Sequence, residues 1–220
     1  MRKLIAAFFT SLDGVIQAPG GPEEDPTGGF AYGGWSFHHW DGEMEEYMGE
    51  GLGKPFDLLL GRRTYDIFAS HWPFTDEEPA ALFNAVTKYV ATAAPEPLAW
   101  QNSVKLQGDV PAAVARLKEG DGPDLLTQGS AVLVRSLLAA GLVDELSLMT
   151  FPVLLGPGKR WYGDNAQAGE WEQLSSRTST TGVIMSRYRP KGPVSTGSFA
   201  HSEPSTAELA RRAKMEAGTW

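Results

Sequence analysis

LLLGRRT at residues 58–64 and LLTQGS at residues 125–130 share one pattern. Each apolar run ends at a glycine, continues with a cationic or hydroxyl residue and opens a helical pattern. A buried strand that passes through glycine into a helix leaves several backbone N–H groups unpaired, and these groups attract anions. One such junction is common in α/β proteins. Two junctions, the first with Arg62 and Arg63, predict a ligand that carries two or more phosphates.

The composition limits the class of protein. With 220 residues and a net charge of −8, we expect one globular domain with a tail and no general affinity for nucleic acid or anionic membranes. An anionic ligand then needs locally concentrated cations, which draws attention to Arg62 and Arg63. The absence of cysteine excludes thiolate chemistry and fits a cytoplasmic protein. The apolar run at residues 4–9 is too short for a secretion signal or a membrane span, so it predicts a first strand.

Hydrophobic patterning predicts alternating strands and helices with antiparallel strands added at one edge, which is a mixed three-layer α/β sheet. Strands are expected near 4–9, 58–60, 88–92, 104–106, 125–127 and 146–151, and helices near 41–51, 64–70, 110–117 and 130–140. Residues 171–178 and 181–188 lack an intervening helix and predict a closing hairpin. The domain is expected to span 1–189, followed by a polar linker at 190–205 and a short helix at 206–216, capped by Ser205.

A long loop rich in glycine and proline is predicted between Gly20 and Gly34. Loops of this length in compact domains are often functional, and we expect this one to close over a substrate. Trp35 and Trp40 end the loop; they fit a protein core or stacking on a planar substrate, and the loop context favours the substrate pocket. His38 and His39 do not predict a metal site, because adjacent histidines point apart and no second pair has i, i+4 spacing.

Six motifs, taken in chain order, resemble a known family. They are SLDGVI (11–16), LGRRTY (60–65), GDV (108–110), QGS (128–130), LVDEL (142–146) and PVLLGPGKR (152–160). Together they resemble the dihydrofolate-reductase-like superfamily, in particular the C-terminal reductase domain of the bifunctional riboflavin-pathway deaminase/reductase, the RibD C-terminal domain family. The resemblance covers roughly residues 2 to 189.

The resemblance implies a stand-alone NADPH-dependent reductase, a homodimer and a set of cofactor contacts. The residues implied at the phosphates are Gly61, Arg62, Arg63 and Thr64, with Arg62 at the 2′-phosphate because a guanidinium binds phosphate oxygens in a bidentate fork. Thr92 is expected near the adenosine ribose. Gln128, Gly129, Ser130, Ala131, Val132 and Leu133 are implied at the pyrophosphate and nicotinamide half. Ala7 and Ile16 are implied beside the nicotinamide ring.

Two carboxylates are candidates for the chemistry. Asp13 fits a simple Asp-Gly turn equally well as a position near the active site, which the resemblance implies. Glu45 lies on the helix where dihydrofolate reductases place their buried carboxylate; the spacing to Gly61 favours Glu45, whereas the Lys54-Pro55 pair favours Glu43. Three carboxylates at 43, 45 and 46 also fit a solvated helix face.

One departure from the family pattern leaves the substrate open. Riboflavin-pathway reductases carry Asp-Asp-Pro and Leu-Thr-x-Arg elements after the second strand, whereas residues 61–68 read GRRTYDIF here. The activity expected from the resemblance is hydride transfer to a small heterocycle, as in 5-amino-6-(5-phosphoribosylamino)uracil reductase or dihydrofolate reductase. Reduction of an unrelated carbonyl or imine, and a non-catalytic nucleotide-binding dimer, remain alternatives. Dimerisation is expected to cover exposed strand edges at 146–151 and at the hairpin.

Overall fold

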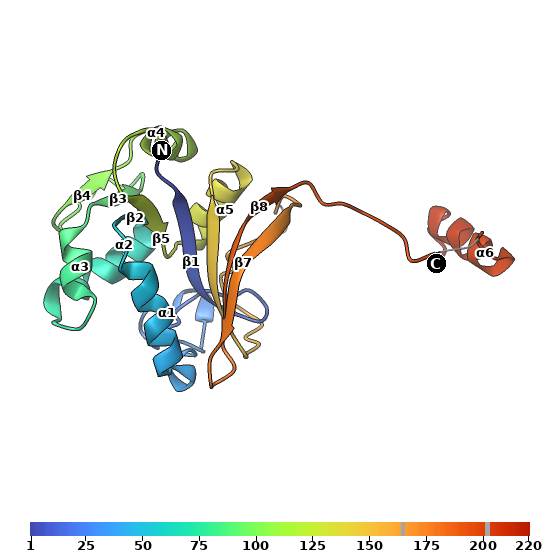
Figure 1. Cartoon of the computed structure of the whole chain (residues 1–220), viewed down its shortest axis with the longest axis horizontal. Helices are drawn as coiled ribbons and strands as arrows, with labels where there is room; N and C mark the ends of the chain where they lie inside the picture. The colour runs from blue at the N-terminus through green and yellow to red at the C-terminus, as the bar shows by residue number, and fades with distance from the viewer. Residues whose placement is uncertain (164–165, 201–202) are drawn as a thin grey trace.

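One mixed β-sheet forms the centre of the protein in a computed structural model, which describes residues 1–163, 166–200 and 203–220 (Figure 1). The sheet has eight strands in the order β4-β3-β2-β5-β1-β6-β8-β7. The strands are β1 Leu4–Ser11, β2 Phe56–Gly61, β3 Lys88–Ala91, β4 Ser103–Lys105, β5 Asp124–Thr127, β6 Glu145–Phe151, β7 Glu170–Thr178 and β8 Ile184–Gly192. The mixed α/β class predicted from the sequence is confirmed.

Six parallel strands form the body of the sheet, and β8 and β7 continue it as an antiparallel hairpin. Every residue of β2 is buried, including Asp57, which pairs with the buried Arg2. Burial on both faces explains why the rest of the strand is apolar rather than alternating. The predicted closing hairpin is confirmed. The expectation that residues 146–151 form an exposed edge is wrong, because β6 pairs with β1 on one side and with β8 on the other.

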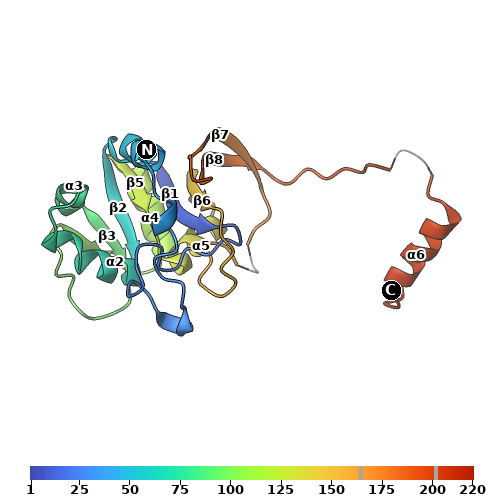
Figure 2. The ribbon, with the colours of Figure 1, turned by 90° about the horizontal axis from the view of Figure 1, so that it is seen from below.

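Helices cover both faces of the sheet. The helices are α1 Gly42–Leu52, α2 Arg62–Ala69, α3 Ala80–Ala85, α4 Val110–Glu119, α5 Ala131–Ala139 and α6 Thr206–Glu216. One face packs against α4 and α5 through side chains such as Val114, Val134 and Leu137. The opposite face packs against α2 and α3 around Phe83, and against α1 around Met44. This gives the three layers expected from the alternating pattern (Figure 2).

Local signals set the helix boundaries where a side chain caps the first turn. Asp41 accepts a hydrogen bond from the Met44 amide at 3.2 Å, and Asp109 accepts one from the Ala112 amide at 2.9 Å. Both helices therefore begin where the sequence predicts. α3 was not predicted, since six residues carry too little periodicity to be recognised from sequence.

The C-terminal tail has little contact with the sheet. Helix α6 begins after Ser205, which accepts a hydrogen bond from the Glu208 amide at 3.2 Å, and it buries none of its residues. Figures 1 and 2 both show α6 apart from the sheet, at the end of an extended segment. Residues 201 and 202 of the predicted linker lie outside the described residues.

Candidate active site

A cavity of about 1100 Å³ lies over the sheet and is lined by α1 and α2. Ile5, Ala7 and Phe9 of β1 line the cavity, because alternate residues of a strand point to the same face. Their sheet neighbours Leu126, Ser147 and Met149 continue the same floor, as the strand register requires. The floor is largely apolar, which is typical of a small-molecule site.

The two glycine junctions meet at this cavity. A Cβ on Gly61 would lie 2.2 Å from the Ser130 hydroxyl, and a Cβ on Gly129 would lie 2.8 Å from the Thr64 hydroxyl. The Gly61 amide also donates to the Gly129 carbonyl at 3.3 Å. Glycine is therefore required at both positions by close approach of the two loops. The structure joins two segments that are more than sixty residues apart in the sequence.

Neither helix N-terminus at these junctions is capped by a side chain. Gly61 precedes α2 and has no side chain to offer, and Ser130 precedes α5 without forming a side-chain cap. The first-turn residues Arg63, Thr64, Ala131 and Val132 line the cavity. Amide groups of both helices are thus available to an anionic ligand, and both helix dipoles favour one.

The cations beside these junctions differ in their partners. Arg62 donates from Nε to both Asp66 carboxylate oxygens at 2.9 Å, and one of its terminal nitrogens lies 3.9 Å from Glu96. Arg63 is exposed, and no hydrogen bond or ion pair within the described residues uses its side chain. Arg135 of α5 lines the cavity as well. Arg63 and Arg135 are accordingly additional candidates for contact with an anion.

Most of the predicted cofactor residues line the cavity. They are Ala7, Ile16, Arg62, Arg63, Thr64, Gln128, Gly129, Ser130, Ala131 and Val132. Gly61 supports this group by its contact with Ser130. Leu133 instead points into the core with 5% of its surface exposed, and Thr92 follows β3 outside the cavity wall. Neither Leu133 nor Thr92 lines the cavity. Leu133 faces another way because it lies one position beyond Val132 on α5.

Asp13 holds a turn. Its carboxylate accepts hydrogen bonds from the Ser11 hydroxyl at 2.6 Å and the Gly156 amide at 2.9 Å, and pairs with Arg160 at 3.0 Å. Burial raises the pKa of Asp13, but the hydrogen bonds from Ser11, Leu155 and Gly156 outweigh it and lower the pKa to about 2. Asp13 does not line the cavity. Of the two roles considered for Asp13, the structure shows the turn.

Trp35, Trp40 and Glu45 also lie outside the cavity wall. Trp35 packs against Phe151 and donates to the Gln17 carbonyl at 2.8 Å, so it belongs to the core beneath the loop. Trp40 packs against Phe9 and donates to Glu45 at 3.1 Å on the exposed side of α1. The two tryptophans therefore do not line the pocket as the loop context predicted. Glu45 lies on a solvated helix face, which was the alternative considered for the carboxylates at 43, 45 and 46.

The loop after β1 supplies a wall of the cavity. Gln17 organises it: its side-chain amide donates to the Asp25 and Thr27 carbonyls at 2.9 Å and its side-chain oxygen accepts from the Lys159 amide at 3.1 Å. The loop residues on the cavity wall are 16–21 with Glu24 and Asp25, and all of them precede Trp35 and Trp40 in the chain. Sequence reasoning missed Glu24; its only signal was a carboxylate within a loop already marked as functional.

A second polar group that was not predicted lies on the floor, under α1. The Tyr47 and Ser147 hydroxyls are 3.0 Å apart, and the Arg187 guanidinium lies over the Tyr47 ring with 5.2 Å to its centroid. Glu145 is 3.8 Å from Arg187. These residues come from α1, β6 and β8, so no motif in the sequence could bring them together. They can hydrogen-bond a polar edge of a ligand.

No group of three His, Asp or Glu side chains suited to a metal ion occurs among the described residues. In the same part of the chain, no helix is long and apolar enough to cross a bilayer.

The fold and cavity define a protein of the dihydrofolate-reductase-like α/β class. Solved structures with this fold include a protein described as a riboflavin biosynthesis protein from Shewanella sp. PV-4, with a TM-score of 0.60, 20% identity and coverage of 86% of this chain and 99% of that one. A pyrimidine reductase-like protein from Corynebacterium diphtheriae has a TM-score of 0.57 and 16% identity, covering 86% and 92%. Dihydrofolate reductase from Enterococcus faecalis, complexed with NADP(H) and RAB-propyl, has a TM-score of 0.54 and 16% identity, covering 86% and 96%.

The family assignment rests on the sequence as a whole. The model of the RibD C-terminal domain matches residues 2–185, and the chain belongs to that family. The uncharacterized protein YyaP of Bacillus subtilis (strain 168) is 26% identical over 200 residues, which covers 87% of this chain and 96% of YyaP. YwjB of the same organism is 26% identical over 167 residues, covering 71% and 80%. The resemblance inferred from six motifs is confirmed.

Proposed function

We propose that the protein is an NADPH-dependent reductase that transfers a hydride to a small heterocyclic substrate, such as a pyrimidine or pterin. One observation carries this proposal: two helix N-termini without side-chain caps meet at one cavity, and the cavity continues over an apolar sheet face. The first part suits the phosphates of a dinucleotide. The second part suits a planar ring and excludes much of the water. Membership of the RibD C-terminal domain family supports the same activity.

The residues present fit NADPH. The amides at Arg63, Thr64, Ala131 and Val132 would hold the phosphate groups, and Arg62 would meet the 2′-phosphate, with Arg63 as the alternative because it has no protein partner among the described residues. Ala7 and Ile16 would flank the nicotinamide ring. When bound, the cofactor supplies a hydride to the acceptor carbon. The protein then needs to orient both rings, exclude water and provide a proton.

The experiment compares binding of NADPH and NADH to the wild type, Arg62→Ala and Arg63→Ala. Losing a bidentate contact to the 2′-phosphate removes a charge-assisted hydrogen bond, so we expect Arg62→Ala to weaken NADPH binding by at least about tenfold and NADH binding by far less. The dissociation constants can be measured by the change in nicotinamide fluorescence.

The two variants control each other. A selective loss in Arg63→Ala alone would move the 2′-phosphate contact to Arg63 and leave the rest of the proposal intact. Equal losses for both dinucleotides would contradict a 2′-phosphate contact at either position. No detectable binding of either dinucleotide to the wild type would refute the reductase proposal.

A further inference from the structure

The carboxylates on the cavity wall differ in whether a cation neutralises them. Asp25 is ion-paired with Lys159, and Glu145 faces Arg187. Asp124 accepts from the Lys3 amide at 2.8 Å, near the amino ends of the strands. Glu24 is half-buried on the loop wall, and no ion pair within the described residues includes it. Glu24 is thus the wall carboxylate that lacks both a cation and a strand contact.

The loop holds the Glu24 side chain in a defined position. Its Oε2 accepts from the Gly20 amide at 2.6 Å, and its backbone amide donates to the Gly21 carbonyl at 3.2 Å. The loop is fixed in turn by the Gln17 hydrogen bonds and by a hydrogen bond from the Gly34 amide to the Ala18 carbonyl at 2.8 Å. The carboxyl group therefore belongs to an ordered wall that also contains Ile16.

Burial raises the pKa of Glu24; the amides of Gly20 and Gly21 partly oppose this shift, and the nearby Asp25 carboxylate adds to it. Lys159 is the cation that pairs with Asp25. The other cationic side chains that line the cavity are Lys3, Lys54, Arg62, Arg63, Arg135 and Arg187, and His71 lines it as well. A carboxyl group with a raised pKa holds its proton to a higher pH than an ordinary glutamate does, which suits general acid catalysis.

We propose that Glu24, which lines the cavity on the same loop as Ile16, is the catalytic acid of this site and donates the proton that accompanies the hydride. This inference rests on the proposed reductase function. In the step, the hydride forms a C–H bond at the acceptor carbon while the C=N, C=C or C=O π bond breaks. The Glu24 O–H proton goes to the atom at the other end of that bond. NADP⁺ and the Glu24 carboxylate remain, and water reprotonates the carboxylate.

The first test measures charge at the nicotinamide end without turnover. NADP⁺ and NADPH share the same phosphates, so the ratio of their dissociation constants cancels phosphate titration and reports the nicotinamide charge. Across the pH range in which Glu24 loses its proton, this ionisation is expected to strengthen NADP⁺ binding relative to NADPH by about tenfold, because the carboxylate attracts the positive ring. Glu24→Gln should abolish this pH dependence. Glu23→Gln, an exposed neighbour, should retain it.

Several results would overturn the inference. A pH dependence that survives in Glu24→Gln would do so, and its loss in His71→Asn would assign the titration to His71. If neither dinucleotide binds to the wild type, the proposed function fails and the inference fails with it. If both bind with a ratio that does not change with pH, the reductase proposal stands and the assignment of Glu24 is refuted.

The second test uses turnover with 5-amino-6-(5-phosphoribosylamino)uracil and dihydrofolate as probes. Loss of a general acid predicts a kcat about 100-fold lower in Glu24→Gln, with KM changed by less than about threefold and partial rescue by Glu24→Asp. Unchanged turnover in Glu24→Gln would refute Glu24 as the acid. A large loss of kcat in Tyr47→Phe in the same assay would then assign that role to the Tyr47–Ser147 hydroxyl pair. If the wild type reduces neither probe, the dinucleotide ratios decide the assignment.

Discussion

At the scale of single residues, the carboxylates of this protein differ in role because their surroundings differ. Asp13 accepts hydrogen bonds from a hydroxyl and two amides, which favour its charged form. Glu24 has burial as its dominant influence, which favours its neutral form. The first arrangement stabilises a turn against Arg160, and the second suits proton transfer. Residue type alone does not distinguish them.

The Asp13 turn predicts a pH-dependent stability. The hydrogen bonds lower the pKa of Asp13 from 3.8 to about 2, so the charged form is favoured by folding. Its stabilising contribution is present above about pH 4 and is lost as the pH falls toward 2. Asp13→Asn should reduce the free energy of unfolding at neutral pH by about 1.5–3 kcal/mol, the range for hydrogen bonds to a charged group.

Thermal melting of the wild type and Asp13→Asn across this pH range checks the prediction. The difference in Tm between the two proteins should narrow below about pH 4, because the wild-type carboxyl becomes protonated as well. A difference that stays constant down to the lowest measurable pH would contradict the proposed electrostatic contribution.

At the scale of elements, the site is built where two strand-to-helix junctions touch. Gly61 ends β2 and Ser130 precedes α5, and the contact between them holds the N-termini of α2 and α5 at one cavity. The two junctions follow neighbouring parallel strands, so their carboxyl ends lie at the same edge of the sheet. That contact sets the relative position of the two helix N-termini at this edge.

Gly61→Ala tests the contact between the junctions. Its Cβ would lie 2.2 Å from the Ser130 hydroxyl, so one of the loops must shift. We expect a loss of about 1–3 kcal/mol in the free energy of unfolding, typical of overpacking, and at least about tenfold weaker NADPH binding. Denaturant unfolding and dinucleotide titration measure these effects.

Gly49→Ala in α1 is the matched control. Gly49 is exposed, and a Cβ there has no atom within 4 Å. Alanine in a helix interior should raise the free energy of unfolding by about 0.5–1 kcal/mol and leave dinucleotide binding unchanged. If Gly61→Ala behaved like Gly49→Ala, close approach of the junctions would not be the reason for glycine at position 61.

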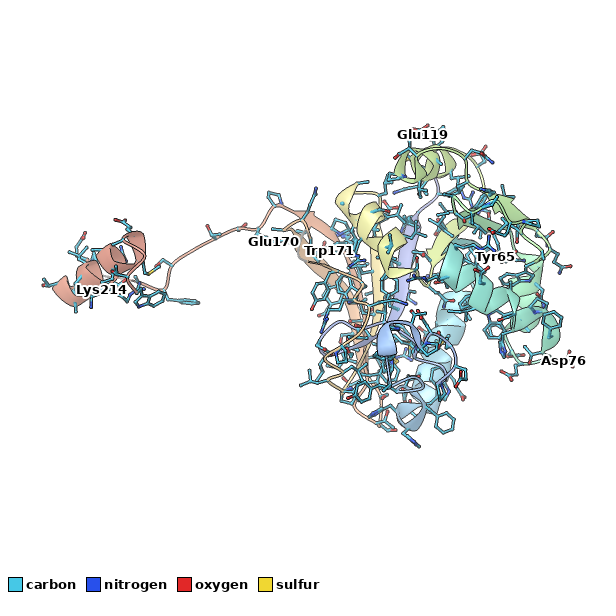
Figure 3. The ribbon with its side chains drawn as sticks, turned by 180° about the vertical axis from the view of Figure 1, so that it is seen from behind. Tyr65, Asp76, Glu119, Glu170, Trp171 and Lys214 are labelled. Carbon is cyan, nitrogen blue, oxygen red and sulfur yellow. The ribbon has the colours of Figure 1, made fainter. Side chains whose placement is uncertain are left out.

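At the scale of the whole molecule, helix α6 buries none of its residues and lies apart from the sheet. Figure 3 shows Glu170 and Trp171 at the start of β7, well separated from Lys214 of α6. Glu170 pairs with Lys191 at 2.8 Å and accepts from the Ser195 amide at 2.8 Å, so contact with the domain extends at least to residue 195. The ion pairs of α6 are internal, between Glu208 and Arg211 or Arg212.

A truncated chain of residues 1–196 should therefore fold like the full chain. We expect the same Tm within about 2 °C, since ΔΔG is near zero where no residue is buried, and unchanged NADPH affinity.

Light scattering on both chains also tests the predicted homodimer. Because β6 pairs on both sides, β7 is the edge strand at the hairpin end of the sheet that a partner could cover. A full-length dimer with a truncated monomer would assign assembly to the tail, and a monomer in both would contradict the dimer prediction.

The sequence determined those features that depend on local signals. The short runs at residues 58–60 and 125–127 predicted β2 and β5, the helical patterns near 41–51 and 110–117 predicted α1 and α4, and the paired strands without a helix predicted the hairpin. The two glycine junctions and the ordered motifs identified the family and a subset of the residues that line the cavity. These signals are local because periodicity, capping and turns act within a few residues.

Only the tertiary structure decided which side chains meet. The sequence marked Asp13, Glu45, Trp35 and Trp40 as site residues, yet each is committed to a turn, a helix surface or the core. Glu24, the Tyr47–Ser147 pair and Arg187 line the cavity instead. The contacts of Tyr47, Ser147 and Arg187 join segments far apart in the chain, whereas Glu24 bonds locally to Gly20. The folding that brings the distant segments together is driven by burial of apolar surface, which leaves no motif at the polar residues themselves. The sequence thus determined the fold and the position of the two glycine junctions, whereas packing decided which polar groups face the space between them.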